Sequence, residues 1–410
     1  MNKFLTELRY RYISVVIFVL IVIIIIAFLV DRLFLASKRK KSQLPCYNQE
    51  LTIWSTFNLK DLSKPIKSIQ KYCLKINVVK KNFDDIKNNL LLETAAGRGP
   101  DIVYIDNDFV LKNLKIFEPY KGNKLDIDNY PDSIIKFLDK KLILYPLTFD
   151  ILVLFVNKTY LANIGLYDYP KTFEEIENII PQLRQTSFTS FQLAPISLGQ
   201  AHNIDNFVEI FLTINKNLNQ ENYASKSAVE NTLDYLSQFI DLNSNLYSWD
   251  YNMPNNILAF SQENLALLPA FYSQKEKIKK INPRLEFAIS SFPKFQKSIK
   301  KYNYLKVYYF GVIKNKKSKY SWLFIEEFDK SYKEFINSKD LIPLRKDTFE
   351  NLDSEKKTLI NELLVGDYFN EANYEFLVET LPKYLEGWLS NKGNLKNTLE
   401  RVDIFKFFKK

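Results

Sequence analysis

Beyond residue 50, the hydrophobic and polar positions of the chain alternate between the spacing of strands and the spacing of helices. Alternating β-branched and aromatic residues predict strands at 51–57, 74–81 and 100–106. Helical spacing separates them at 60–73 and at 83–97, where Gly97 takes the position of a C-cap. Strands and helices in this order are joined by right-handed crossovers, so the pattern predicts an α/β fold with a parallel sheet.

A second α/β unit follows the first. Two apolar runs flank Pro146 to Asp150, a helix begins near Lys158, and Thr172 and Glu175 have the spacing of a capping box. Further patterns predict strands at 191–199, 285–293 and 304–314, helices at 172–184, 204–215, 226–243 and 376–389, and a strand that continues as a helix at 263–281. The chain leaves one unit near 110–150 and returns to it near 305, which predicts two lobes with a hinge and a cleft.

Near the N-terminus, residues 13–30 form a hydrophobic run in which only Ser14 is polar. A helix of this length spans ~27 Å, close to the thickness of one hydrocarbon core. No small-residue cleavage site follows the run, and the residues before Cys46 do not fit a lipoprotein signal. We therefore predict an uncleaved transmembrane anchor at 13–30, a cytoplasmic N-terminus at 1–12 and a basic tether at 31–49.

The net charge of +10 is concentrated around this hydrophobic run. Residues 1–46 hold eight basic and two acidic side chains, so the globular part is only weakly basic. This distribution gives no support to nucleic-acid binding. Three basic residues precede the run and five follow it, and this count alone places the C-terminal side in the cytoplasm. A long domain can be translocated against such a bias, so orientation depends on the identity of the domain.

Residue types that carry catalysis or bind metals are scarce. His202 is the only histidine, and Cys46 and Cys73 have no metal-ligand spacing, although they could pair in an oxidising compartment. The chain has none of the nucleophile-elbow, zinc-protease, P-loop or dinucleotide-binding motifs. The sequence therefore predicts no enzyme, no metal site and no cofactor.

An ordered set of motifs between about residues 50 and 410 resembles one known family. The motifs are GRGPDIVYID (97–106), LYPLTFDILVLFVNKTYLANIGLYDYPKTFEEI (144–176), FSQENLALLPAFYSQKEKI (260–278), SKYSWLFIEEF (318–328) and LIPLRKDTF (341–349). Together they resemble the extracellular solute-binding proteins of bacterial ABC importers, in the class (family 1) that includes maltose-binding protein.

The resemblance implies a two-lobed fold like that of periplasmic binding proteins, with a hinge and an interlobe cleft. Lobe 1 would comprise 50–150 with a return segment at about 305–345, and lobe 2 would comprise 151–304 with part of the helices at 346–410. It also implies a monomeric receptor that captures a small solute, a sugar or oligosaccharide, and delivers it to the transmembrane permease subunits of an ABC importer. Such a receptor faces outside, so the resemblance places the globular domain on the extracytoplasmic side of the cell membrane.

Candidate ligand-binding residues follow from strand ends and from the resemblance, because ligands of such folds bind at the carboxyl ends of strands. The candidates are Trp54, Ser55, Asn58, Asp106, Asn107, Asp108, Asp150, Tyr251, Phe271 and Tyr272. Carboxylates and amides would bind sugar hydroxyls, and aromatic rings would contact the C–H faces of a sugar. Structural roles stay open for several of them: Trp54 in the core, Asp106 as a helix N-cap, and Phe271 with Tyr272 in packing.

The sequence departs from the family pattern at two places. Gln262, Glu263 and Asn264 stand where a glycine and an alanine are usual, and the bulky segment YNYLKVYYFG (302–311) replaces a glycine-rich turn. Bulky residues there could narrow the cleft. The alternative hypothesis is therefore a solute-binding-like surface protein that has lost its transport ligand and acts as a sensor or interaction scaffold.

Overall fold

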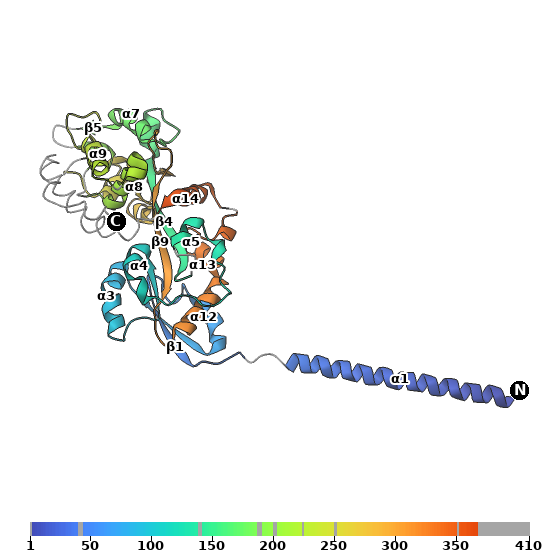
Figure 1. Ribbon diagram of the computed structural model, residues 1–410. Coiled ribbons are helices and arrows are strands. Elements are labelled where there is room, and N and C mark those ends of the chain that lie inside the picture. Colours follow the sequence, from blue (N-terminus) through green and yellow to red (C-terminus); the bar gives the residue numbers. More distant parts are fainter. Residues whose placement is uncertain are drawn as a thin grey trace. The chain divides into compact units, whose positions relative to one another are not determined.

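The computed structural model contains two units, of which the larger carries the α/β fold (Figure 1). The described residues are 2–39, 44–137, 142–186, 191–199, 203–223, 225–249, 252–350 and 352–367. One unit comprises Met1–Gln49 with Ile69–Lys75, and the other comprises Glu50–Ser68 with Ile76–Lys410. The first therefore contains the hydrophobic run and both cysteines.

The described residues form strands and helices in alternation. The strands are β1 (Gln49–Ser55), β2 (Leu74–Lys80), β3 (Ile102–Asp106), β4 (Tyr145–Asn157), β5 (Gln185–Thr186), β6 (Phe191–Ile196), β7 (Leu265–Phe271), β8 (Phe287–Ser291), β9 (Asn303–Val312) and β10 (Gly366–Asp367). The α-helices are α1 (Asn2–Arg39), α2 (Ser63–Ile69), α3 (Phe83–Ala95), α4 (Asn107–Asn113), α5 (Asp132–Phe137), α6 (Lys158–Asn163), α7 (Phe173–Leu183), α8 (Phe207–Asn219), α9 (Lys226–Ser237), α10 (Asn256–Ser261), α11 (Gln274–Ile281), α12 (Ser318–Asp329), α13 (Tyr332–Ser338) and α14 (Ser354–Val365). Short 3-10 turns are η1 (Gln70–Tyr72), η2 (Leu114–Ile116), η3 (Ile127–Asn129), η4 (Gln220–Asn222) and η5 (Lys346–Thr348).

The strands form one connected sheet in the order β2-β1-β3-β9-β4-β7-β6-β5, with β8 also paired to β4 and β10 to β9. β1 and β3 are parallel, with Ile53 opposite Ile102, as the alternation of strands and helices predicted. β9 lies between β3 and β4 and is antiparallel to both. The sheet is therefore mixed, and β9 is the strand by which the chain returns to its first α/β unit.

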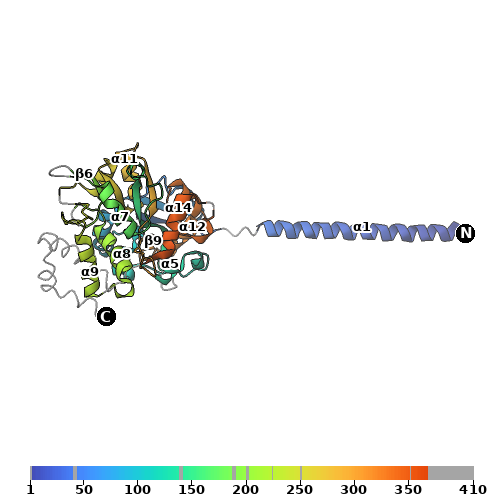
Figure 2. The same cartoon turned by 90° about the horizontal axis from the view of Figure 1, so that it is seen from above.

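β4 joins the two lobes. Its first half, Tyr145–Ile151, pairs with β9, and its second half pairs with β7 and β8. We call the part built on β1, β3, β9 and the first half of β4 the first lobe. The part built on the second half of β4 and on β5 to β8 is the second lobe. Figures 1 and 2 show α8 beside α9 on the second lobe, and Figure 1 shows α3 and α4 on the first.

β4 is one continuous strand of 13 residues, all of them buried. The sequence showed only two apolar runs on either side of Pro146 to Asp150. The proline has no N–H to donate, and a shift in register between Pro146 and Thr148 accommodates it within the strand. Because the strand continues, Asp150 lies at its middle and is paired with Lys306 of β9, where the lobes meet.

Helix boundaries follow the capping signals of the sequence. At α7 the Thr172 side chain accepts from the backbone N–H of Glu175, and the Glu175 carboxylate accepts from the N–H of Thr172, so the predicted capping box is confirmed. Gly97 ends the α3 segment with a φ of +73°, which only glycine adopts at no steric cost. The sequence missed the short helices α5 and α10. The predicted helix at 376–389 lies outside the described residues.

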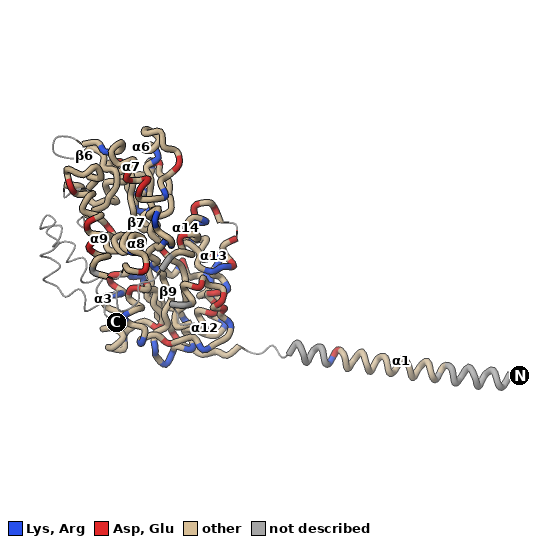
Figure 3. The backbone as a smooth tube through the Cα atoms, turned by 45° about the horizontal axis from the view of Figure 1, so that its top comes forward, with Lys and Arg blue, Asp and Glu red and all other residues tan. Residues whose placement is uncertain are grey.

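The first unit consists mainly of α1, which extends beyond the predicted span 13–30 at both ends. Within α1, Val15–Arg32 is long and apolar enough to cross a membrane, and it is the one such segment in the described part of the chain. Figure 3 shows the described part of this helix without charged residues until its C-terminal end. Its large apolar side chains are exposed, as a helix facing hydrocarbon requires.

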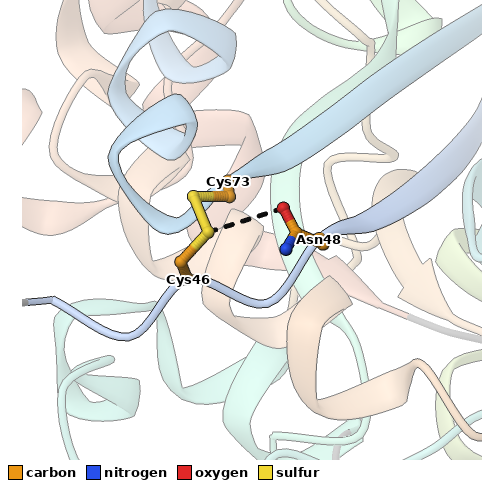
Figure 4. The surroundings of a disulfide bond; sticks show 3 residues. All are labelled: Cys46, Asn48 and Cys73. Atoms are coloured by element: carbon orange, nitrogen blue, oxygen red, sulfur yellow. Dashed lines mark hydrogen bonds between the residues drawn. A yellow bond between two sulfur atoms is a disulfide. The ribbon is translucent and has the colours of Figure 1, made fainter.

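The two cysteines, whose state the sequence left open, form a disulfide within the first unit (Figure 4). The bond joins Cys46, at the end of the tether, to Cys73, directly after the turn η1. Beside it, the N–H of Tyr47 donates to the carbonyl of Tyr72 at 2.9 Å. The tether is therefore fixed covalently to the segment that precedes β2.

Candidate functional site

A cavity of about 570 Å³ lies where the two lobes meet. Small-molecule sites commonly have volumes of roughly 300–1,000 Å³. The lining residues come from the first lobe (Thr56, Phe57, Phe83, Tyr104), from β4 and β9 (Thr148, Phe149, Asp150, Tyr308), from the second lobe (Tyr272, Ser273, Lys275, Glu276) and from 337–342 at the end of α13. A molecule in this cavity therefore contacts both lobes.

Four aromatic rings form a connected cluster on the first-lobe side of the cavity. Tyr104 packs 4.8 Å from Phe57 and 5.4 Å from Phe83, measured between ring centroids. Tyr308 stacks on Tyr104 at 5.7 Å and contacts Phe83 at 5.1 Å. Burial, with nearby negative charge, raises the pKa of both tyrosine phenols, which therefore stay protonated at neutral pH. The cluster combines apolar ring faces with hydroxyl groups.

Asp150 adds a buried carboxyl group to the cavity, and only 4% of the residue is exposed. Its Oδ1 atom accepts hydrogen bonds from the backbone N–H groups of Ile151 at 3.0 Å and Ser273 at 3.1 Å. Burial raises the pKa of this carboxyl above its usual value, although the contacts with Ser273 and the charge of Lys306 oppose the shift. Asp150 is thus held in place from both β4 and the start of α11.

The charged side chains at the cavity are largely balanced by one another. Lys275 forms an ion pair with Glu355 of α14. Lys339 forms an ion pair with Asp61 of the first lobe. The Nζ atom of Lys356 lies 2.7 Å from the Asp340 carboxylate. Lys275 and Lys339 are the lysines among the described lining residues, and both are already paired, so neither is left to neutralise an anionic ligand.

Asp106 and Asn107 lie at the start of α4 and bind protein groups. The Oδ1 atom of Asp106 accepts from the N–H of Phe109 at 3.2 Å, which is the N-cap role that the sequence left open. Its Oδ2 atom lies 2.5 Å from the Lys87 ammonium. The side-chain oxygen of Asn107 accepts from the N–H of Val307 at 2.8 Å. These contacts attach α4 to α3 and to β9.

Asp108 and Phe271 both lie against Lys306. Asp108 accepts from the Tyr304 hydroxyl at 3.0 Å, and its second oxygen lies 3.3 Å from the Lys306 ammonium. The same ammonium lies 5.0 Å from the centre of the Phe271 ring. Burial raises the pKa of Asp108 to about 6, and the positive charge of Lys306 opposes this shift. The sequence predicted both residues for ligand contact, and the structure brings them together around a lysine.

The other predicted residues are distributed more widely. Trp54 is buried in β1 under the Lys81 ammonium, 4.4 Å from its ring centre. Ser55 is fully buried, and its hydroxyl oxygen accepts from the N–H two residues further on. Asn58 is exposed in the following turn, and Tyr251 lies outside the described residues. None of these contacts tests ligand binding, which stays a prediction for each.

Asp150 and Tyr272 are the predicted residues that line the cavity. The Tyr272 hydroxyl donates to Glu355 at 2.7 Å, which fixes the ring. The sequence pattern did not predict the aromatic cluster. Phe57 lies two residues after β1, and Phe83 lies three residues after β2 at the start of α3, so the strand-end rule could have identified them. Tyr104 and Tyr308 lie inside strands, where the pattern indicates only core.

The cavity suits reversible binding of a neutral, hydroxyl-rich molecule. Aromatic ring faces can bind the apolar C–H surfaces of such a molecule, and a carboxylate can accept hydrogen bonds from its hydroxyl groups. Among the residues that the structure describes, no group of three or more His, Cys, Asp or Glu side chains is placed to hold a metal ion. The arrangement is that of a binding site.

One family model matches most of the chain. The model of bacterial extracellular solute-binding proteins matches residues 67–357. No curated protein matches the chain.

Solved structures with this fold come from several bacteria, at sequence identities that establish the fold alone. The maltotriose-binding protein of Thermus thermophilus, bound with maltotriose, has a TM-score of 0.66 at 17% identity. The match covers 88% of this chain and 99% of that protein. The GacH receptor of Streptomyces glaucescens, solved unliganded and with acarbose, has a TM-score of 0.69 at 15% identity, covering 88% and 98%. An ABC substrate-binding protein of Listeria monocytogenes in complex with cycloalternan has a TM-score of 0.67 at 14% identity, covering 88% and 98%.

Proposed function

The chain belongs to the family of bacterial extracellular solute-binding proteins, and from this premise we propose that it captures a neutral sugar or oligosaccharide for an ABC importer. The solute binds in the interlobe cavity and is passed to the permease subunits of the importer. The observation that carries the proposal is that the four-ring cluster and Asp150 line one cavity. Sugars match both, because their C–H faces are apolar and their hydroxyls donate hydrogen bonds.

The charge balance of the lining supports an uncharged solute. Lys275 and Lys339 are already paired with Glu355 and Asp61. An acidic sugar or a phosphate ester would have to break one of these pairs or enter without a countercharge, and an unpaired charge out of water is costly. The similar structures were solved in complex with maltotriose, acarbose and cycloalternan, which agrees with the proposed class.

Binding in this site would favour closure of the lobes. A ligand shifts a conformational equilibrium only by its differential affinity for the two states. The Phe57 and Tyr104 rings belong to the first lobe, and Tyr272 and Ser273 to the second, so a ligand that touches both stabilises the closed state. The protein thus acts by binding and release, without a chemical step.

We further propose that residues 13–30 of α1 anchor the protein as a single-pass monomer, with 1–12 in the cytoplasm and the globular domain outside. The family is extracellular, and the disulfide between Cys46 and Cys73 is a bond that persists in oxidising compartments. Both observations favour an extracytoplasmic domain, against the orientation that the excess of basic residues after the run would indicate. Residues 31–49 then form the tether outside the bilayer. The first lobe takes the proposed boundaries 50–150 with the return segment at about 305–345, and the second takes 151–304 with part of the helices at 346–410.

A screen of thermal stability against neutral sugars, acidic sugars and short peptides tests the proposal. We expect neutral sugars or oligosaccharides to raise the Tm and to reduce the radius of gyration in scattering. Replacing Tyr308 by alanine should weaken binding about tenfold, in keeping with the value of one aromatic contact. Tyr167→Ala is the matched control, because Tyr167 is 79% exposed and lies outside the cavity lining.

Binding of acidic sugars or peptides in place of neutral sugars would contradict the proposed solute class. Stabilisation by none of these compounds would contradict solute capture itself. That outcome would favour the alternative of a surface protein that has lost its ligand.

A further inference from the structure

Lys306 projects from β9 into a ring of acidic and aromatic groups beside the cavity. Its ammonium nitrogen lies 3.3 Å from a carboxylate oxygen of Asp108 and 3.5 Å from one of Glu209. The three side chains are only 14%, 9% and 18% exposed. Removing such charges from water is costly unless they pair with one another, so these contacts hold the ammonium at this point.

The groups that hold Lys306 come from opposite lobes. Asp108 lies on α4, which follows β3 in the first lobe, whereas Glu209 lies on α8 in the second lobe, as Figure 1 shows for the two helices. The Phe271 ring, at the end of β7 in the second lobe, lies 5.0 Å from the ammonium. A single cation is therefore shared by both lobes.

Neighbouring acidic groups have other partners. Asp106 pairs with Lys87 at 2.5 Å, and Asp150 is held by backbone N–H groups. Among the described residues, the acidic groups within ion-pair distance of Lys306 are thus Asp108 and Glu209, one for each lobe. Their negative charges, with those of Asp106 and Asp150, raise the pKa of Lys306, so the ammonium stays charged in spite of burial.

Lys306 lies directly beside the cavity. Asp150, its partner across the strands, and Tyr308, two residues further along β9, both line the cavity. Lys306 is not among the lining residues, because its side chain fills the adjoining space between α4 and α8. A bound ligand would make contacts of the same kind there, to a carboxylate of each lobe and to an aromatic face.

We propose that Lys306 is a built-in ligand of the cleft, whose ammonium joins the two lobes and excludes the solute from the space between Asp108, Glu209 and Phe271. Lys306 is then a specificity-determining residue, because it limits the length of the solute to the cavity beside it. It also holds the lobes together before solute arrives. The effect on solute length rests on the proposed function, whereas the junction between lobes does not.

Chemical rescue tests whether the site recognises a cation. Lys306→Ala removes three carbons and the ammonium, which n-propylammonium replaces. We expect millimolar n-propylammonium to raise the Tm of K306A by about 2 °C or more, because a ligand of the folded state alone stabilises it. The uncharged 1-propanol should give no such rise.

The control variant is Lys301→Ala. Lys301 is also ion-paired and its side chain is 18% exposed, close to that of Lys306, but its partner is Glu362 of α14. A rise in Tm that is confined to K306A supports the proposal. An equal rise in K301A, an equal rise with 1-propanol, or no rise in K306A would overturn it.

The junction between the lobes is tested by a milder variant, which also serves if K306A does not fold. Glu209→Gln removes the charge of the second lobe and leaves the pair of Lys306 with Asp108. We expect a larger radius of gyration for solute-free E209Q than for the parent protein, and no change for K301A. A radius equal to that of the parent would overturn the junction. Neither experiment uses the solute, so each can fail while the proposed function stands.

Discussion

Asp150 is expected to lower the stability of the fold at neutral pH and is proposed to bind the solute. Burial raises its pKa, so the folded protein holds this proton more tightly than the unfolded chain does. Stability from this group therefore falls as pH rises from the unfolded value of 3.8 through the raised folded value. We expect Asp150→Asn to unfold at a higher urea concentration than the parent at pH 7, with a smaller difference at pH 4.

The same variant should bind solute more weakly, because an amide is a weaker acceptor than a carboxylate. Urea midpoints and solute titrations on one preparation separate the two effects. Asp168→Asn, at an exposed position, serves as the control and should change neither. A D150N protein that is less stable than the parent at pH 7 would show that its hydrogen bonds outweigh the cost of burial.

At this scale the sequence predicted the site in part. Asp150 stood out because burying an unpaired carboxylate between two apolar runs costs free energy, which indicates a functional role. Tyr104, Tyr308 and Lys306 did not stand out, because residues inside strands follow the same pattern whether they face a core or a cleft. Which strand face borders the other lobe is decided by tertiary packing, and single-sequence periodicity carries no record of it.

Among the secondary-structure elements, the turn after β6 depends on one glycine. Gly199 has a φ of +101°, and a Cβ atom there would lie 2.8 Å from the carbonyl oxygen of Leu236 and 2.9 Å from the Cβ of Phe239. Gly165 has a φ of +76°, and no atom lies within 4 Å of the place where a Cβ atom would stand. We expect G165A to lose about 1 kcal/mol of unfolding free energy, from the left-handed backbone alone.

G199A should lose more, by roughly 1–3 kcal/mol further, because overpacking forces neighbouring groups to move. Urea denaturation of both variants measures the difference. Equal losses would mean that α9 shifts to accommodate the methyl group without cost.

Elements with local signals were predicted well, and elements set by distant partners were not. The capping box of α7 follows from a short-range pattern, and the parallel direction of β1 and β3 follows from the alternation of strands and helices along the chain. The continuity of β4 does not follow from a local pattern, because the strand pattern breaks at Pro146. Pairing with β9 keeps the strand continuous there through an irregular register. Two lobes could therefore be predicted, but not the strand that they share.

For the molecule as a whole, the disulfide between Cys46 and Cys73 is a covalent constraint on the unfolded chain. It closes a loop of sequence separation 27, for which the chain-entropy relation gives about 3.5 kcal/mol. Cys46→Ser with Cys73→Ser should lower the urea-derived unfolding free energy by about this amount. A loss well below 1 kcal/mol would show that the unfolded chain gains little freedom on removal of the bond.

Thiol labelling tests the proposed orientation. In intact cells, a membrane-impermeant maleimide should label the protein only after treatment with a reductant, because Cys46 and Cys73 are the only cysteines, form a disulfide, and lie outside the membrane in the proposed orientation. Labelling that requires lysed cells would place the domain inside. The sequence alone left this question open, since counts of basic residues and the motifs point in opposite directions.

The place of β9 in the sheet has a consequence for the order in which the chain can fold. β9 lies between β3 and β4, yet β5 to β8 of the second lobe are all synthesised before it. Until β9 is made, β3 and β4 have no strand between them, and the first lobe cannot complete its sheet. Pairing over such sequence distance is slow. In the proposed orientation, a chain that crosses the membrane in sequence order would therefore be unable to complete the sheet of its first lobe until β9, at Asn303–Val312, had crossed.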